Sequence, residues 1–421
     1  MSKRKFSLLR RREEFHSHYT AIDIGTEVVK ALVVKREEDR GIVIGVGKVR
    51  QNLTDMQAGA VSDIQAVIDN VDRALTEAED MCQLVPGQAV IGIAGEQIKG
   101  FSTSVSVPRA QSQTRITQAE VAQSLQMVQR RALREAVRQM SQEMGVPEVN
   151  VKLVHSAITG IKVDGYPVSN PLNFQGRSLD LTIFNTVAPL THIGALQTIA
   201  QELDLELVAT VAEPYAMARG CANDEVYELG GIFVDIGGGT TDVALVRNGG
   251  IEGTRMFALG GRAFTRRLAG ELGMSLEQAE QFKLAHGSGT LTADQRKLAH
   301  DAVDPSSEVL AQGVALALED MARGEALPPA IYIAGGGAAL PEVADQLRAL
   351  NWTEYLPFPK TPTIEVLRPE AVTGVYDSTG LLTGTQDITP MGLAYHAIQL
   401  DDEEDQPLGG VMRRIMRAMK V

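Results

Sequence analysis

The chain has 421 residues, of which 44% are hydrophobic and 22% are charged; this composition is typical of a folded protein, and one hydrophobic core rarely serves such a length. The formal net charge of −13 argues against general nucleic-acid binding, which requires a basic face. The chain has only two cysteines, no secretory leader, no apolar run of membrane-spanning length and no metal-ligand spacing among its histidines, so we expect a cytoplasmic protein.

The amino-terminal segment, residues 1–18, is a basic arm. Its charged side chains precede the first predicted strand: Lys3, Arg4, Lys5, Arg10, Arg11 and Arg12. The arm is interpreted either as a contact with an anionic surface or as a disordered, solubilising segment, and the pattern leaves both open.

Two strand–turn–strand units form an internal duplication. In the first, an apolar strand ends at Asp23, turns through Gly25 and Thr26, and resumes as a strand that carries Lys30. In the second, a strand ends at Asp235 and meets a glycine-rich turn composed of Gly237, Gly238, Gly239, Thr240 and Thr241. Each unit leads into a third strand, at 42–49 and at 250–258. We call the units clip 1 (residues 21–34) and clip 2 (residues 231–246).

The residue types in the clips indicate phosphate binding. Glycine lets backbone N–H groups approach an anion closely, and Thr240 and Thr241 add hydroxyl donors. A carboxylate beside a bare phosphate would repel it unless a cation lay between them. We therefore expect Asp23 and Asp235 to organise Mg²⁺, directly or through its waters.

The segment between the clips is predicted to hold an inserted α+β unit. A helix is expected from about Ser62 to Cys82, followed by strands at 89–94 and 98–107. Thr117 and Glu120 form a capping box that opens a second long helix, which runs to about Met144, and two more strand-like runs follow at 151–163 and 179–185. The exposed face of that helix bears Arg130, Arg131, Arg134 and Arg138, which are interpreted as a solvated face or as a site for an acidic partner.

Two further motifs follow clip 2. Ser275 and Gln278 form a capping box for a helix at 276–287. A strand at 331–334 then enters a turn made of Gly335, Gly336 and Gly337.

The carboxyl-terminal tail, residues 411–421, is predicted to be a basic amphipathic helix. Met412, Ile415, Met416 and Met419 share one face, and the other face carries Arg413, Arg414, Arg417 and Lys420. Such a helix is typical of binding to an anionic membrane surface or to a partner's groove, and packing on its own domain is the alternative. The acidic, Pro/Gly-punctuated stretch at 400–410 resembles a flexible tether.

Both clips, with their aspartates in register, and the glycine turn at 335–337 resemble the phosphate and adenosine motifs of the actin, Hsp70 and sugar-kinase superfamily. From about Tyr19 onward the chain resembles the FtsA family of bacterial actin-like proteins. In that family a helix similar to 276–287 brings a glutamate and a lysine to the nucleoside, so these roles fall on Glu280 and Lys283. Gly260 and Gly261 resemble a turn near the ribose, and an ordinary strand-to-helix turn is the alternative.

The resemblance implies an α/β, actin-like ATPase fold with two duplicated lobes, a small inserted α+β subdomain and a carboxyl-terminal amphipathic helix. The expected divisions are a basic arm (1–18), lobe one (19–87, 166–227 and 376–399), the inserted subdomain (88–165), the core of lobe two (228–262 and 326–375), its helical subdomain (263–325), an acidic tether (400–410) and the amphipathic helix (411–421).

The resemblance also implies a function. The chain would bind ATP and Mg²⁺, form homopolymers and tether the FtsZ division ring to anionic lipids on the cytoplasmic face of the membrane at the division site. The helical subdomain would receive the FtsZ tail, and the inserted subdomain would contact later division proteins. Slow Mg²⁺-dependent hydrolysis is expected, with Asp23, Asp235 and Glu213 as the catalytic candidates, and Glu213 orienting the attacking water.

Two features depart from the FtsA pattern. Val28 stands where many relatives carry lysine, whereas the placement of Lys30 resembles actin and PilM, the cytoplasmic FtsA-like protein of type IV pilus machines. Glu213-Pro214 resembles the connecting helix of Hsp70 and PilM. A PilM-like component of a pilus assembly complex is therefore the alternative. The basic tail favours the FtsA-like interpretation, because PilM-type proteins dock a peptide of a membrane partner. A sugar kinase would need a substrate pocket that no segment indicates, and an Hsp70-like chaperone would need a peptide-binding domain after residue 400.

Overall fold

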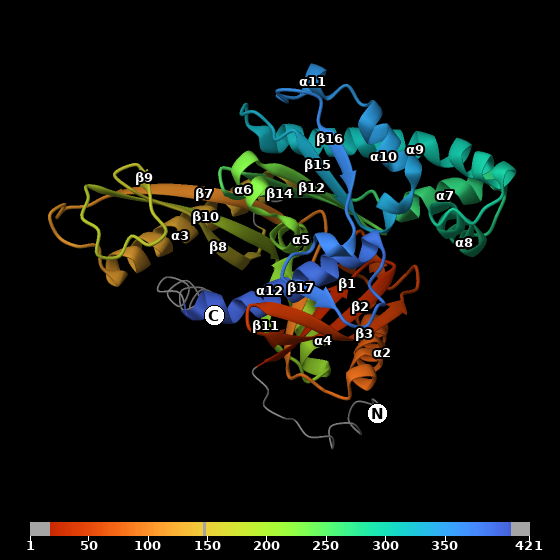
Figure 1. The fold of residues 1–421 in the computed structure, drawn as a ribbon, viewed down its shortest axis with the longest axis horizontal. Helices are drawn as coiled ribbons and strands as arrows, with labels where there is room; N and C mark the ends of the chain where they lie inside the picture. The colour runs from red at the N-terminus through yellow and green to blue at the C-terminus, as the bar shows by residue number, and fades with distance from the viewer. Residues whose placement is uncertain (1–16, 146–148, 406–421) are drawn as a thin grey trace.

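The computed structural model describes residues 17–145 and 149–405. Two lobes face each other, with an inserted unit extending to one side, at the left of Figure 1. Each lobe has its own sheet, and the chain crosses between the lobes several times. The candidate site lies where these crossings bring the turns of the two lobes together.

The sheet of lobe one has six strands in the described part of the chain. Its clip strands pair as an antiparallel hairpin that places Asp23 opposite Lys30. The spatial order of the strands is β11 (Glu206–Ala212), β6 (Gln88–Ile93), β1 (His18–Ile24), β2 (Val28–Glu37), β3 (Arg40–Arg50) and β17 (Val375–Asp377). A separate two-stranded ribbon consists of β4 (Met56–Gln57) and β5 (Ala60–Val61).

The second sheet has nine strands within the described ranges. It joins the core of lobe two to the inserted unit in the order β16 (Thr363–Val366), β15 (Ala330–Ala334), β12 (Gly231–Ile236), β13 (Thr241–Arg247), β14 (Gly250–Phe257), β7 (Lys99–Pro108), β10 (Ser178–Pro189), β8 (Val151–Val163) and β9 (Tyr166–Pro167). The hairpin and third strand β12–β13–β14 repeat the arrangement of β1–β2–β3. The predicted duplication is therefore confirmed.

The helices pack on the faces and ends of these sheets. They are α2 (Ile64–Cys82), α3 (Gln118–Met144), α4 (Leu190–Glu202), α5 (Glu213–Cys221), α6 (Asp224–Leu229), α7 (Gly261–Leu272), α8 (Leu276–Gly287), α9 (Ala293–Ala322), α10 (Pro341–Ala349), α11 (Trp352–Tyr355) and α12 (Ile388–Asp405), with 3₁₀ turns η1 (Gly336–Ala339), η2 (Pro369–Ala371) and η3 (Thr385–Asp387). The capping boxes at Thr117 and Ser275 are present as predicted. In Figure 1, α7, α8 and α9 lie together at the right-hand end of lobe two.

The inserted unit has different bounds from the expected 88–165. Strand β6 pairs in parallel with β1, so it belongs to lobe one. Strand β10, expected in lobe one, pairs antiparallel with both β7 and β8. The unit therefore runs from β7 to β10, because hydrogen bonding assigns these strands to a sheet that sequence spacing alone does not reveal. Its own core lies between these strands and α3.

The inserted unit is hydrogen-bonded to lobe two although its chain enters from lobe one. The junction consists of β7 beside β14, where Gly253 faces Phe101 and Thr254 faces Gly100. A Cβ atom at Gly100 would lie 2.1 Å from the Thr254 hydroxyl, so only glycine lets the strands meet here.

The carboxyl-terminal region differs in part from the expected tether. Helix α12 continues to Asp405, through half of the acidic stretch at 400–410. The physical reason is that the first helix-breaking residue after Gln399 is Pro407, and aspartate and glutamate are tolerated in a helix. The basic arm up to residue 16 and the predicted membrane helix at 411–421 lie outside the described residues. No helix in the described ranges is both long and apolar enough to cross a membrane.

Candidate nucleotide site between two hairpin turns

The turns of clip 1 and clip 2 touch each other. A Cβ atom on Gly238 would lie 2.5 Å from the Glu27 side chain, and one on Gly239 would lie 2.8 Å from the Thr26 hydroxyl. These distances are too short for any side chain, so the consecutive glycines are what lets the two turns meet. Gly25 is constrained in its own turn, because a Cβ there would lie 2.8 Å from the carbonyl oxygen of Val28.

The turn of clip 2 presents free backbone donors. The Gly237 amide closes the turn by donating to the Thr240 carbonyl at 2.9 Å. The amides of Gly238 and Gly239 donate no hydrogen bond within residues 17–145 and 149–405. Successive amides of this kind form an anion-binding nest. The hydroxyl of Thr241, which we expected to add a donor, instead donates to the Leu259 carbonyl at 2.7 Å inside the protein.

Lys30 is held by the aspartate of clip 1. Its Nζ donates to Asp23 Oδ2 at 2.8 Å, and both side chains are largely buried. Burial by itself lowers the pKa of Lys30, but the neighbouring Asp23 carboxylate outweighs this effect and the net pKa is raised. Lys30 is therefore a fixed cation at the base of clip 1, and to contact a phosphate it must share its protons with Asp23.

Clip 2 brings a second buried carboxylate that the sequence analysis missed. Asp242 on β13 lies directly opposite Asp235 on β12, and both are buried. Burial raises the pKa of Asp235 and raises that of Asp242 well above its usual range, where the charge of Asp235 adds to the effect. The sequence could have predicted this position of Asp242, because the residues on either side of a hairpin turn pair in fixed register. Thr389 at the start of α12 donates to Asp235, and Thr240 hydrogen-bonds Asp242.

Glu213 joins the same carboxylate group from the first turn of α5. It fits there because Gly92 on β6 has no side chain, and a Cβ at Gly92 would lie 2.9 Å from Glu213 Oε1. Burial raises the pKa of Glu213 well above its usual range, with further contributions from the charges of Asp23, Asp242 and Asp235. The structure thus brings all three catalytic candidates into one electrostatic cluster.

The raised pKa of Glu213 predicts a pH-dependent stability. The folded protein holds a proton on Glu213 at pH values where the unfolded chain has released it, so stability falls as pH rises above the ordinary glutamate pKa of about 4.3. Glu213→Gln removes this titration and keeps the shape. Its thermal unfolding midpoint should exceed that of the wild type at pH 8, and the difference should shrink toward pH 4. Glu202→Gln, at the exposed end of α4, is the control; a lower midpoint for Glu213→Gln at pH 8 would contradict the argument.

The third glycine turn packs against clip 2. Gly335 has a φ of +84°, and a Cβ there would lie 2.1 Å from Asp235 Oδ1. Its amide donates to the Thr385 carbonyl at 3.0 Å, and the Thr385 hydroxyl donates back to the Gly335 carbonyl at 2.6 Å. A Cβ at Gly337 would collide with Ile236, whereas Gly336 faces open space. Neither Thr385 nor Thr389 was predicted, because the return of the chain near 385 shows no motif of its own.

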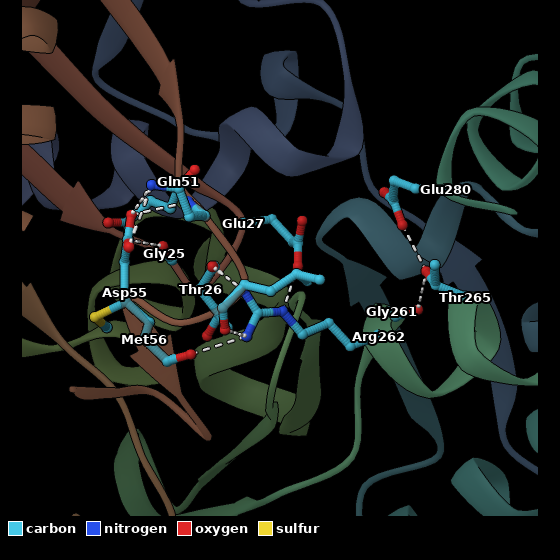
Figure 2. Close-up of polar contacts among 12 residues, drawn as sticks. Gly25, Thr26, Glu27, Gln51, Asp55, Met56, Gly261, Arg262, Thr265 and Glu280 are labelled. Carbon is cyan, nitrogen blue, oxygen red and sulfur yellow. Dashed lines mark hydrogen bonds and ion pairs between the residues drawn. The ribbon is translucent and has the colours of Figure 1, made fainter. Parts of the chain in front are cut away.

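The predicted nucleoside pair is connected to clip 2 through the start of α7. Lys283 Nζ donates to Glu280 Oε2 at 2.7 Å, to the Thr265 hydroxyl at 3.0 Å and to the Gly261 carbonyl at 3.2 Å. Figure 2 shows Glu280, Thr265 and Gly261 across from the clip 1 residues. Gly260 abuts clip 2, since a Cβ there would lie 2.6 Å from the Gly237 carbonyl oxygen. Thr265 is a further residue that the sequence analysis missed.

The donor set fits a magnesium-bound nucleotide better than a protein-only metal site. Across the described ranges, no three acidic, histidine or cysteine side chains are placed to hold a metal ion by themselves. Mg²⁺ in nucleotide sites usually takes one or two carboxylates, several waters and the phosphates of the ligand. Asp23 and Asp235 can supply the carboxylates. Asp242 has a buried Oδ1 atom with no hydrogen-bond partner in the described structure.

The sequence is similar to those of known cell-division proteins. The family model for cell division protein FtsA matches residues 232–375. FtsA of Pseudomonas aeruginosa is 24% identical over 94% of this chain and 96% of its own length. FtsA of Neisseria meningitidis is 24% identical over 65% of this chain and 63% of its own length. FtsA of Bacillus subtilis is 26% identical over 63% of this chain and 57% of its own length. The last two alignments span less than two thirds of the relative.

The fold has a solved counterpart. A structure described as a PilM-PilN type IV pilus biogenesis complex matches with a TM-score of 0.63 and 20% identity, over 90% of this chain and 98% of that one. At this identity the likeness concerns the fold. In sequence the chain is thus similar to the FtsA cell-division proteins, and its fold is actin-like.

Proposed function

We propose that the chain is an ATP-binding, polymer-forming protein that tethers the FtsZ division ring to the cytoplasmic membrane. The observation that carries the proposal is the direct meeting of two glycine turns, one from each lobe, above a group of buried carboxylates. A ligand gripped by both turns couples its own binding to closure of the lobes. Lobe closure in turn changes the surface that a neighbouring copy meets, so the bound nucleotide would bias assembly.

Within this proposal, separate groups of residues bind the phosphates, the metal and the nucleoside of ATP. The free amides of Gly238 and Gly239 would bind phosphate oxygens, and Asp23 and Asp235 would face the metal. Lys283 and Glu280 would approach the nucleoside beside Gly260 and Gly261, and Gly335, Gly336 and Gly337 would line the adenosine side. Bound Mg²⁺ supplies charge neutralisation at the phosphates.

Hydrolysis in this site is proposed to be slow. Glu213 would orient an attacking water, and to accept a proton from that water Glu213 must be ionised. The raised pKa of Glu213 reduces that ionised fraction at neutral pH. The proposed role is therefore a nucleotide-dependent switch in assembly, in which fast turnover is not required.

Membrane attachment is proposed to come from the tail. One weak basic amphipathic helix gives reversible binding, whereas a polymer that presents many copies binds tightly through effective concentration. The proposed location is therefore the cytoplasmic face of the membrane at the division site. The helical subdomain (α7, α8 and α9) is proposed to receive the FtsZ tail, and the inserted unit to contact later division proteins.

The test of tethering compares the full chain with a chain that ends at Asp405, which keeps α12 intact. Both are sedimented with anionic phosphatidylglycerol vesicles, with Mg²⁺ and either ATP or no nucleotide. The full chain should co-sediment, more strongly with ATP, and the truncated chain should stay in the supernatant. Equal binding by both chains would contradict the tether. Neutral phosphatidylcholine vesicles are the control, and they should bind neither chain.

A PilM-like role in a pilus assembly complex is the second candidate. It is supported by the fold likeness and by the resemblance of Lys30 and Glu213-Pro214 to PilM, whereas the sequence matches favour FtsA. The two proposals make opposite predictions for the tail. Under a PilM-like role, removing residues 406–421 would leave membrane recruitment to a partner's peptide, and neither chain would bind vesicles alone.

A further inference from the structure

One side chain of lobe two reaches across the site to lobe one. Arg262 is the second residue of α7, and its side chain is 13% exposed. Its guanidinium donates to four lobe-one acceptors: the carboxylate of Glu27, the Thr26 carbonyl at 2.8 Å, the Met56 carbonyl at 2.8 Å and the Leu53 carbonyl at 3.1 Å. Figure 2 shows this side chain lying between the clip 1 turn and the loop that carries Met56. Four of the five donors of the guanidinium fork are thus satisfied by lobe one.

The two lobe-one segments that Arg262 binds are connected to each other. The Gln51 amide donates to the Glu27 carbonyl at 2.8 Å, and the Gln51 side chain donates to the Gly25 carbonyl at 2.7 Å. Asn70 on α2 donates to both Gln51 and Asp55, at 3.2 Å and 2.9 Å. The clip 1 turn and the loop at 51–56 are therefore one hydrogen-bonded unit, and the guanidinium holds this unit as a whole.

Arg262 also contacts clip 2 through its backbone. Its amide donates to the Gly238 carbonyl at 2.8 Å, and the Gly261 amide donates to the Gly237 carbonyl at 2.8 Å. The same residue is thus fixed to clip 2 by its main chain and to clip 1 by its side chain. Separating the clips breaks the Arg262 contacts and leaves Glu27, which is only 18% exposed, without its main cation.

We propose that Arg262 is an interlobe latch: a positioning residue that holds clip 1 against clip 2 when the lobes are closed, and that must release before they open. In combination with the proposed ATP site, the latch sets how fast nucleotide leaves. A lysine at this position keeps the charge but loses the planar fork, so its three N–H donors cannot reach all three carbonyls and the carboxylate at once. The positive charge of a lysine therefore does not restore the contacts that Arg262 makes.

The test measures lobe separation in the nucleotide-free protein, so it does not depend on the proposed function. Spin labels are attached at Asp69→Cys on α2 and Glu277→Cys on α8, both exposed, in the full chain with Cys82→Ser and Cys221→Ala. Pulsed electron paramagnetic resonance then gives the distance distribution. Arg262→Met should shift it to longer distances and broaden it, Arg262→Lys should give an intermediate distribution, and Glu27→Gln should give a smaller shift because three carbonyl contacts remain.

Arg267→Met is the matched control, because Arg267 lies on the same helix and pairs with Glu271, and both side chains are exposed. It should leave the distribution of the parent unchanged, and circular dichroism should show all variants folded. A distance distribution for Arg262→Met that coincides with that of the parent would overturn the latch.

In a second experiment, a fluorescent ADP analogue should dissociate from Arg262→Met at least about tenfold faster than from the parent. A parent that binds no nucleotide would refute the proposed function and leave the distance result decisive for the latch.

Discussion

Replacing Asp235 with alanine is expected to abolish Mg²⁺-dependent ATP binding, with a loss of affinity of about 100-fold or more, as removal of a charged ligand group typically produces. Asp235 is the last residue but one of β12 in clip 2, lies opposite Asp242 and packs against the third glycine turn. Its carboxylate thus belongs to clip 2 and also faces the predicted adenosine side. The measurement is calorimetric titration with ATP, with Mg²⁺ and with EDTA.

Asp235→Asn separates binding from folding. Asparagine keeps an acceptor for the Thr389 hydroxyl. It also removes the buried carboxyl group of Asp235, whose pKa is raised by burial. This variant should therefore unfold at the same or a higher temperature than the wild type at pH 8, and still fail to bind Mg²⁺-ATP. Unaltered affinity in Asp235→Asn would show that the nucleotide site lies elsewhere.

Gly335→Ala is expected to be among the most destabilising single methyl additions in the chain. The added Cβ would lie 2.1 Å from Asp235 Oδ1 and 2.5 Å from the Ile236 carbonyl oxygen, at a φ of +84°. Left-handed backbone and forced overpacking each cost about 1–3 kcal/mol, so the free energy of unfolding should fall by about 2–5 kcal/mol. Urea unfolding followed by circular dichroism measures the change.

Gly336→Ala, one residue further on, is the matched control. No atom lies within 4 Å of a Cβ at Gly336, so its free energy of unfolding should stay within about 0.5 kcal/mol of the wild type. If Gly336 faces the nucleotide as proposed, this variant should lose ATP affinity without losing stability. Equal destabilisation by both substitutions would contradict the packing described for the third turn.

Local sequence patterns predicted the hairpins and caps well, because these depend on neighbouring residues. The strand–glycine–strand pattern gave both clips, and Ser/Thr with a Glu or Gln three residues later gave the caps at Thr117 and Ser275. The sheet membership of β6 and β10 was not predictable in this way. It depends on pairing between strands far apart in the chain, and the same apolar alternation is compatible with either sheet.

Most of the residues that could not be predicted from the sequence act through partners distant in the chain. Arg262 is bound to residues near position 27 and position 55, and Thr389 to Asp235. Asp242 is the exception, because hairpin register around the glycines of clip 2 places it opposite Asp235. The charge and the Pro/Gly residues of the stretch at 400–410 predict a tether, although residues 400–405 contain no helix breaker and continue α12.

The most direct test of the account is a crystal structure of the full chain with Mg²⁺ and a non-hydrolysable ATP analogue. We predict phosphates against the free amides of Gly238 and Gly239 in clip 2 and beside the clip 1 turn, the metal on the side of Asp23 and Asp235, and the nucleoside beside Glu280 and Lys283. An analogue bound by one lobe only, or bound away from both turns, would contradict the claim that one nucleotide is held by both clips.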